Sequence, residues 1–240
     1  EADKLEYREL TEDDPNFFEE YQIYYEQSRQ DILEKLEEIK AAVENGDLRD
    51  IEYQHINSLM FGNHLYQPLL YLGEGTGIEV KPVALNQGER EFVEDLKLYY
   101  ENTPEFFERK ELYLLRNRSR GHGIGFFEAG NFYPDFIMWL VDGDTQHVTF
   151  IDPKGIGRVG IEDPKIKFFE TIKALEKDLG DKDVQLHSFI ISNTPLHQIP
   201  IQIENMSQAD WEAKNVLFQV EDKASYVRLL FPKIISSSPS

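Results

Sequence analysis

The sequence predicts an α/β fold with a mixed central sheet flanked by helices. Residues 88–102 and 165–179 have apolar side chains at the three- to four-residue spacing of an amphipathic helix. Apolar runs of strand length lie between and after them, so the order is helix, antiparallel strands, helix, strand. Because the second helix connects two of these strands, we expect that pair to be parallel.

The first 50 residues are predicted to form an acidic helical appendage. After a polar lead-in, apolar side chains recur at helical spacing from Pro15 to Val43. Asp14-Pro15 suits the start of this helix and Asn45-Gly46 suits its end. Its first half carries an aromatic stripe made of Phe17, Phe18, Tyr21, Tyr24 and Tyr25. Such a stripe needs a partner surface, so we expect it to pack on the main domain or on a domain absent from this chain.

Residues 51–235 are predicted to form the main domain, and residues 236–240 a tail. Two short strands, 67–72 and 78–83, flank a glycine-rich turn. This turn lacks the Lys-Ser/Thr ending of a phosphate loop, so we expect a plain hairpin connection. Asn86 is expected to cap the helix that follows.

The later strands are separated by clear turn and cap signals. They are expected at 111–117, in two parts of 125–141 interrupted near Gly130, at 146–155 and at 184–192. Gly143-Asp144 is predicted to form the hairpin turn before the strand at 146–155. Asp163-Pro164 suits the start of the helix at 165–179, and Gly180 suits its end.

The composition excludes several classes of protein. The 240 residues are 40% hydrophobic, enough for a sizeable core, and include no cysteine. The lack of cysteine excludes a disulfide scaffold, a Cys-ligated metal site and a thiol nucleophile, and it fits a reducing cytoplasm. No apolar run is long enough to predict a membrane span, and no signal peptide is visible. Because the sequence starts with Glu1, we expect a segment of a longer protein.

The charge is acidic overall but changes sign locally. The net charge is −20, and residues 1–50 contain 17 acids and 6 bases, whereas residues 109–122 contain five Lys or Arg and one acid. The residues of this basic strip expected to contact phosphate are Arg116, Arg118, Arg120 and His122. The alternative is a solvated loop. Lys165 and Lys167 lie at a helix start, a position that disfavours cations, and they are expected to reach the same phosphate-binding surface as the basic strip.

Two acids and a lysine indicate metal-assisted chemistry. Asp135 precedes an apolar strand, and Asp152 ends the next strand after a short hairpin. Neighbouring strands lie about 4.8 Å apart, so both carboxylates can converge on a divalent cation such as Mg²⁺ or Mn²⁺. Lys154 projects to the same side as Asp152, where it could position a water or stabilise a phosphate. The alternative is an ordinary turn at a strand end.

These residues resemble the motif of the PD-(D/E)xK nuclease superfamily. Pro134-Asp135 matches the first half of the motif, and Asp152-Pro153-Lys154 matches the second, with Asp where many members have Glu. The resemblance implies a restriction-endonuclease-like core. Pro153 is unusual within a strand, and it leaves open whether Lys154 stays beside the metal.

The resemblance also implies a third acidic ligand on the first core helix. The matching residue is Glu89, with Glu91 as the alternative, and Glu128 is a further competitor before the motif. Roughly residues 65–195 are similar to the C-terminal nuclease segment of restriction-type DEAD/DEAH helicases, including type III restriction subunits.

The implied function is a Mg²⁺-dependent DNA endonuclease domain, the nuclease part of a larger helicase-linked restriction or defence protein. Asp135, Asp152 and Glu89 would hold the ion, and Lys154 would position the attacking water. The implied partners are DNA and a helicase or ATPase domain or subunit, because this sequence contains no Walker-type phosphate loop. The alternative, favoured by the net charge of −20, is a nuclease-like module that binds DNA or a partner subunit without cutting. The sequence leaves DNA versus RNA open.

Overall fold

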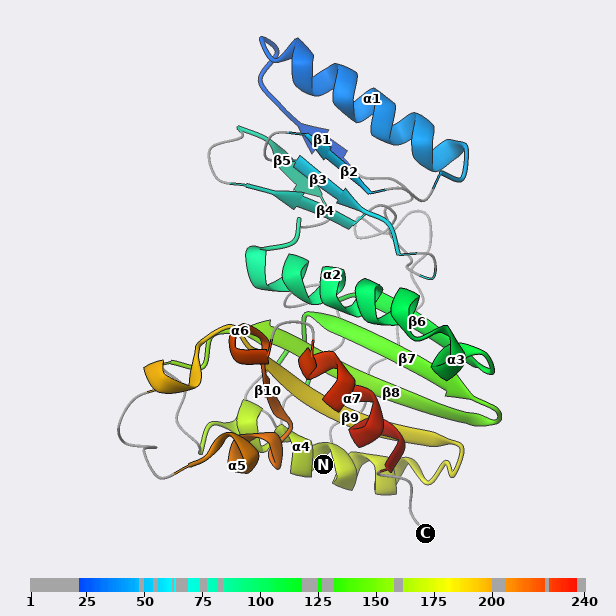
Figure 1. Ribbon diagram of the computed structural model, residues 1–240, viewed down its shortest axis with the longest axis vertical. Helices are drawn as coiled ribbons and strands as arrows, with labels where there is room; N and C mark the ends of the chain where they lie inside the picture. Colours follow the sequence, from blue (N-terminus) through cyan, green and yellow to red (C-terminus); the bar gives the residue numbers. More distant parts are fainter. Residues whose placement is uncertain are drawn as a thin grey trace.

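The computed structural model describes residues 22–47, 50–53, 56–61, 63, 69–73, 77–81, 84–117, 125–126, 132–157, 162–199, 206–222 and 225–236. Its elements are shown in Figure 1. In chain order they are β1 (Gln22–Tyr24), α1 (Gln30–Glu44), β2 (Ile51–Tyr53), β3 (Ile56–Leu59), β4 (Leu69–Leu72), β5 (Glu79–Lys81), α2 (Gln87–Asn102), α3 (Pro104–Phe107), β6 (Lys110–Arg116), β7 (Phe136–Asp142), β8 (Thr145–Lys154), α4 (Pro164–Leu179), β9 (Val184–Ser192), η1 (Leu196–Gln198), α5 (Gln208–Glu212), β10 (Val216–Phe218), α6 (Gln219–Asp222) and α7 (Ser225–Ser236).

The main sheet has five strands in the order β10-β9-β8-β7-β6. Its β6–β7 and β7–β8 pairs are antiparallel, whereas β8–β9 and β9–β10 are parallel. The expected mixed α/β sheet is therefore confirmed. The parallel pairing of β8 with β9 across α4 is confirmed as well.

Helices cover both faces of this sheet, with α2 and α7 on one side and α4 on the other (Figure 1). Strand β7 contributes side chains to the hydrophobic cores on both faces of the sheet, because successive side chains of a strand point to opposite faces. Phe136, Met138 and Leu140 pack with α2 and α7, whereas Ile137 packs with α4. A strand buried on both faces must be apolar throughout, which explains the continuous apolar run in the sequence.

The expected caps and turns of this part are confirmed. Asn86 and Glu89 form a reciprocal capping box at the start of α2. Gly143 has a φ of 62° in the tight turn between β7 and β8, and Gly180 has a φ of 67° at the C-terminal cap of α4. Glycine adopts these left-handed conformations without the steric penalty of a side chain.

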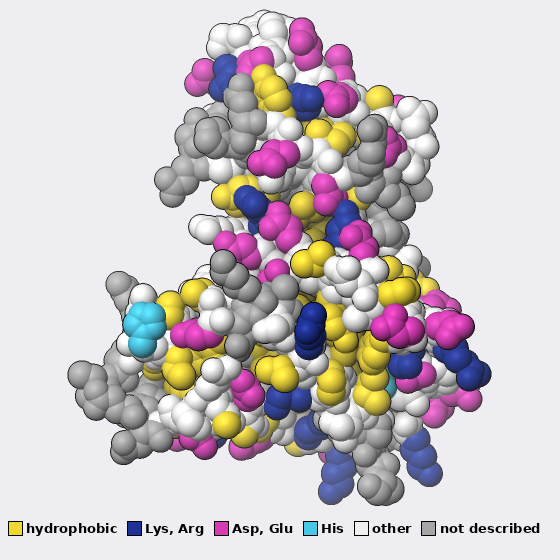
Figure 2. Space-filling view, viewed as in Figure 1, with side chains coloured by type: hydrophobic (Ala, Val, Ile, Leu, Met, Phe, Trp, Pro, Cys, Tyr) yellow, Lys and Arg dark blue, Asp and Glu magenta, His cyan; other side chains and the backbone are white. Residues whose placement is uncertain are grey.

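The N-terminal part is a smaller packed unit. Helix α1 buries Ile32 and Ile39 against residues of the small sheets, including Ile56 and Leu72. The expected domain boundary between residues 50 and 51 therefore falls inside one hydrophobic cluster. Acidic side chains are spread over this unit in the upper part of the space-filling view (Figure 2).

Two expectations about this unit were wrong. The helix expected from Pro15 is wrong for residues 22–29, because β1 pairs with β5 and α1 begins only at Gln30. Isoleucine and tyrosine favour strands, so their spacing here also fits a strand. The members of the aromatic stripe before residue 22 lie outside the described residues. The expected hairpin of residues 67–83 is also wrong, because β4 pairs with β3 while β5 pairs with β1.

Residues 125–141 contain one described strand of the main sheet. Phe126 and Phe132 form only an isolated bridge before β7, and residues 127–131 lie outside the described part of the chain. Over the residues described, none of the helices combines the length and the apolar character needed to span a membrane.

Candidate active site

The register of the main sheet brings Asp135 and Asp152 together. The last β7–β8 pair is Phe136 with Ile151, and the two aspartates follow directly beyond it. Pairing of β8 with β9 continues to Lys154, so the end of β8 extends past β7. Pro153 lies in this overhang, where β8 has no β7 residue beside it. The missing N–H of proline is tolerated at such a position, and Lys154 stays in the strand.

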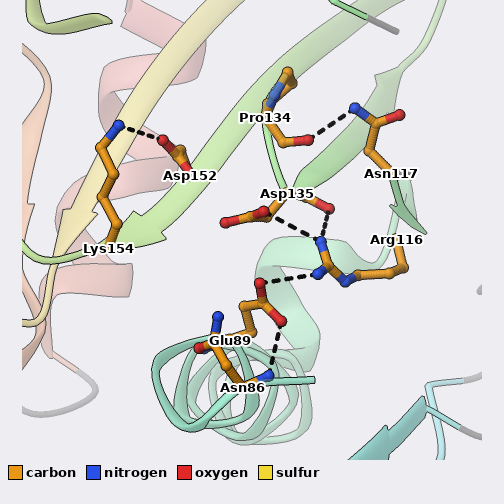
Figure 3. A network of polar contacts seen from close by, with 8 residues as sticks. All are labelled: Asn86, Glu89, Arg116, Asn117, Pro134, Asp135, Asp152 and Lys154. Carbon is orange, nitrogen blue, oxygen red and sulfur yellow. Dashed lines mark hydrogen bonds and ion pairs between the residues drawn. The ribbon is translucent and has the colours of Figure 1, made fainter. Parts of the chain in front are cut away.

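Asn117 and Arg116 hold the chain at Asp135 (Figure 3). The Asn117 side chain donates a 2.8 Å hydrogen bond to the carbonyl of Pro134, and its backbone N–H donates to the carbonyl of Asp135 at 2.8 Å. Arg116 Nη1 donates to that same carbonyl at 2.7 Å. Sequence analysis missed Asn117, because an asparagine after a strand gives no signal of the distant carbonyl that it contacts.

Lys154 and Asp152 form a close ion pair on the same side of β8, as expected. Lys154 Nζ lies 2.5 Å from Asp152 Oδ2, and Asp152 is only 6% exposed. The ammonium also lies 5.4 Å from the centre of the Phe132 ring. Lys165 Nζ lies 5.7 Å from the centre of the same ring. The structure therefore places Lys165 beside the aromatic ring that Lys154 contacts.

Glu89 reaches the cluster from the first turn of α2. It is 3% exposed, and its Oε2 accepts a 2.9 Å hydrogen bond from the backbone N–H of Asn86. Its Oε1 lies 2.9 Å from Arg116 Nη2. Burial raises the pKa of Glu89, and so does the charge of Asp152, whereas Arg116 and the Asn86 N–H lower it. Glu91 instead accepts a hydrogen bond from Gln87 at the helix surface, so α2 directs Glu89 into the cluster.

The two aspartates have strongly unfavourable electrostatics. Burial and then a hydrogen bond and repulsion from Asp152 raise the pKa of Asp135 to about 8, against the lowering effect of Arg116. Two carboxylates this close either share a proton or need a cation between them. The raised pKa of Asp135 indicates that the pair shares a proton, which a cation bound between the two carboxyl groups would displace.

The donor set fits Mg²⁺ with a small number of protein ligands. Within the described ranges, no group of three His, Cys, Asp or Glu side chains is arranged to hold a metal ion. The two close carboxylates are instead Asp135 and Asp152, while Glu89 is turned toward Arg116. Mg²⁺ is commonly bound by one or two carboxylates, with water and substrate phosphates completing its shell. A pair of carboxylates is sufficient for that mode of binding.

The residues expected to contact phosphate are only partly assembled. Arg116 is 15% exposed at its side chain and engages the carboxylates. Lys167 forms an ion pair with Glu162, and its side chain is 47% exposed. Arg118, Arg120, His122 and the competing ligand Glu128 lie outside the described residues.

Comparisons with known proteins identify no relative of this chain. No protein-family model matches it, and neither a curated protein nor a solved structure matches it. The resemblance to PD-(D/E)xK nucleases therefore depends on the motif residues, their positions at the strand ends and the order of the elements.

Proposed function

We propose that this chain contains a metal-dependent nuclease domain of the PD-(D/E)xK type that hydrolyses phosphodiester bonds in DNA. The observation that carries the proposal is the meeting of Asp135 and Asp152 at adjacent strand ends, with Lys154 paired to Asp152. Sequence alone suggested these three residues, and the register of the sheet supports their acting together. Buried carboxylates need such a functional or structural reason, because an uncompensated buried charge is costly.

The order of elements supports a restriction-endonuclease-like core. Helix α2 precedes three antiparallel strands, β6 to β8, and α4 then leads to β9, which is parallel to β8. This order fits the core that the motif implies, with an acidic residue of the first helix near the two strand-end aspartates. Strand β10 and helices α5 to α7 extend that core.

Asp135 and Asp152 would hold a Mg²⁺ ion, with Glu89 near them. The ion would polarise a phosphate oxygen and stabilise the negative charge that develops during hydrolysis. The Lys154 ammonium forms an ion pair with Asp152, and from that position it could donate a hydrogen bond to a water molecule or to a phosphate oxygen. The hydrolysis would add water to the phosphorus and break its bond to the 3′ oxygen of the preceding nucleotide, which leaves a 5′ phosphate and a 3′ hydroxyl that takes up a proton.

The larger context follows from the acidic charge and the composition. A body with a net charge of −20 repels DNA, so binding needs local cations such as Lys165 and the basic strip around Arg118. A helicase or ATPase domain or subunit would supply the motor and additional DNA contacts. The lack of cysteine fits action in a reducing cytoplasm, as part of restriction or defence.

The proposal is tested with supercoiled plasmid and either Mg²⁺ or Mn²⁺. We expect nicking that EDTA stops, and a loss of about 100-fold or more in Asp152→Asn and Lys154→Gln. Asp142→Asn is the matched control. Asp142 lies beside the turn of the β7–β8 hairpin, at the end away from the candidate site, and it pairs with Lys110 at 3.4 Å. Equal nicking by all variants would place the activity elsewhere or in a contaminant.

Metal binding has a separate readout in thermal unfolding. A ligand that binds only the native state stabilises it, by about 2.7 kcal/mol at 100 times Kd. For a chain of this size that corresponds to a rise in Tm of about 5–10 °C. We expect Mg²⁺ to raise the Tm of the wild type and of Asp142→Asn, but not of the double variant Asp135→Asn/Asp152→Asn. An equal rise in the double variant would place the ion elsewhere.

A second candidate is a nuclease-like module that binds DNA or a partner subunit without cutting. The observation that favours it is that both Glu89 oxygens are already engaged, by Arg116 and by the Asn86 N–H. In that case the plasmid stays intact at every metal concentration, while DNA binding in EDTA persists. The nicking assay therefore separates the two candidates.

A further inference from the structure

Arg116 lies inside the acidic cluster and contacts two of its members. It is the last residue of β6, and its guanidinium lies 5.2 Å from the centre of the Phe136 ring. Arg116 Nη2 lies 2.9 Å from Glu89 Oε1, and Nη1 lies 3.4 Å from Asp135 Oδ1. Figure 3 shows this side chain between α2 and the start of β7. An arginine in this position neutralises the cluster from within.

The charges of the cluster are divided between two cations. Lys154 pairs with Asp152, whereas Arg116 pairs with Glu89 and Asp135. Asp135 therefore has Arg116 on one side and Asp152 on the other. Removing one partner of a buried pair leaves an uncompensated charge, so the protein without metal depends on Arg116.

The contacts of Arg116 differ in length. Its contacts with the Asp135 carbonyl and with Glu89 measure 2.7 and 2.9 Å, whereas the contact with the Asp135 carboxylate measures 3.4 Å. The carboxylate contact is thus the longest of the three. A divalent cation bound to that carboxylate would repel the guanidinium, because unlike a neutral ligand it adds positive charge beside it.

We propose that Arg116 is an internal counter-cation that competes with a divalent metal ion for the carboxylate of Asp135. The inference rests on the proposed metal-dependent function and names how metal binding at that site is regulated. Without metal, Arg116 stabilises the cluster. With metal, the 3.4 Å contact is lost while the guanidinium stays on Glu89 and on the Asp135 carbonyl. Arg116 therefore sets a concentration threshold for metal binding.

The test is metal affinity, measured by calorimetric titration of Mn²⁺ into the purified chain. Arg116→Gln removes the charge and keeps a hydrogen-bond donor, and we expect it to lower the Kd for Mn²⁺ by about 10-fold, because it removes a positive charge that would repel the bound cation. The same variant should have a lower Tm in EDTA. Lys110→Gln is the matched control, because it neutralises a cation at the other end of β6 and should leave the Kd unchanged.

A second measurement uses the wild type and does not depend on how well the variant folds. The side-chain Nε–H signal of Arg116 in an NMR spectrum, assigned with Arg116→Lys, should shift when Mg²⁺ saturates the site. An unchanged or higher Kd in Arg116→Gln would overturn the inference, and so would an unchanged Arg116 signal, because Arg116 would then only position the ligands.

The outcomes separate this inference from the proposed function. If the wild type binds Mn²⁺ and Asp135→Asn/Asp152→Asn does not, the metal site stands. An unchanged Kd in Arg116→Gln then overturns only the role of Arg116. If the wild type binds no Mn²⁺ at millimolar concentration, both proposals fail.

Discussion

His147 and His187 form a buried pair on neighbouring strands β8 and β9. Both residues are 2% exposed, and His147 Nδ1 lies 3.3 Å from His187 Nε2. Burial is the largest cause that lowers the pKa of each histidine, and it lowers that of His187 to about 3, with contributions from Lys173 and His147. The pKa of His147 is lowered even though the nearby carboxylates of Asp142 and Glu176 act to raise it. The pair is therefore structural and neutral at pH 7.

The first prediction concerns stability in acid. An unfolded histidine has a pKa of about 6.5, so the unfolded chain takes up protons below that pH while His187 stays neutral in the folded chain. Stability is therefore lost as the pH falls from about 6.5 toward 3. For His187 the loss between pH 7 and pH 5 is about 2 kcal/mol. Urea unfolding at both pH values should show a smaller loss in His187→Gln than in the wild type.

An NMR titration checks the same prediction without a variant. The ring signals of His187 should stay those of a neutral imidazole down to pH 4.5. Titration of His187 near pH 6.5 in the folded protein would contradict the prediction.

Those residues of the candidate site that lie at the ends of apolar strands could be predicted from their local sequence. Asp135, Asp152 and Lys154 stand at the ends of apolar strands, and a short hairpin connects the two aspartates, so local spacing indicated their meeting. The ion pair of Arg116 with Glu89 was not predictable, because 27 residues separate them and only the packed fold determines their distance. Without that information, Arg116 was expected to contact phosphate as part of the basic strip.

At the scale of elements, the loop after β9 holds the overhanging end of β8. The backbone N–H of Asn193 donates to the carbonyl of Lys154 at 3.2 Å, and Thr194 Oγ1 accepts from the N–H of Ile156 at 3.1 Å. A Cβ added at Gly155 would lie 3.0 Å from Thr194 Oγ1 and 3.1 Å from Asn193 Oδ1. Gly155 thus allows the two chain segments to approach closely beside Lys154.

The second prediction follows from that close approach. Asn193 and Thr194 are held in place by their hydrogen bonds to this end of β8, so they yield little, and Gly155→Ala should lower stability by about 1 kcal/mol and the Tm by about 2–4 °C. The displaced loop should also weaken the hold on Lys154 and reduce nicking. Differential scanning calorimetry and the plasmid assay measure the two effects.

The control for this prediction is a neighbouring glycine. A Cβ at Gly157 would meet Thr194 Cγ2 at 3.4 Å, an ordinary van der Waals distance, so Gly157→Ala should change the Tm little. In Thr194→Ala, which lacks the nearest atom, Gly155→Ala should cost less than in the wild type. Equal costs in both backgrounds would show that the clash is not the cause.

Elements with their own local signals were predictable, and elements defined by distant partners were not. Helix α2 has its capping box and α4 has Gly180, so their bounds follow from nearby residues. Strand β1 has three residues, and its pairing partner β5 lies more than 50 residues away. The aromatic residues in and around it therefore suggested a longer helix, since a short apolar run fits both the helical and the strand period.

At the scale of the whole molecule, the small N-terminal unit is linked to the main sheet by specific contacts. The Asn63 side chain donates to the carbonyl of Leu112 at 2.9 Å, and the N–H of Leu114 donates to the carbonyl of Asn63 at 3.0 Å. Lys97 of α2 pairs with Asp50 at 2.7 Å. The acidic N-terminal unit is therefore attached to the main domain, and its negative charge would repel DNA that binds nearby.

The third prediction concerns this charge. Glu34 and Glu37 are exposed on α1, so Glu34→Gln/Glu37→Gln removes two negative charges while Ile32 and Ile39 stay packed. If the unit only repels DNA, affinity measured in EDTA at low salt should be equal or tighter than in the wild type. The difference should disappear above about 0.3 M salt, where the Debye length is well under 10 Å. Lys40→Gln, on the exposed surface of the same helix, makes the unit more acidic and should weaken binding at low salt. Weaker binding by the double glutamate variant would mean that α1 contacts DNA directly, because lost repulsion alone cannot reduce affinity.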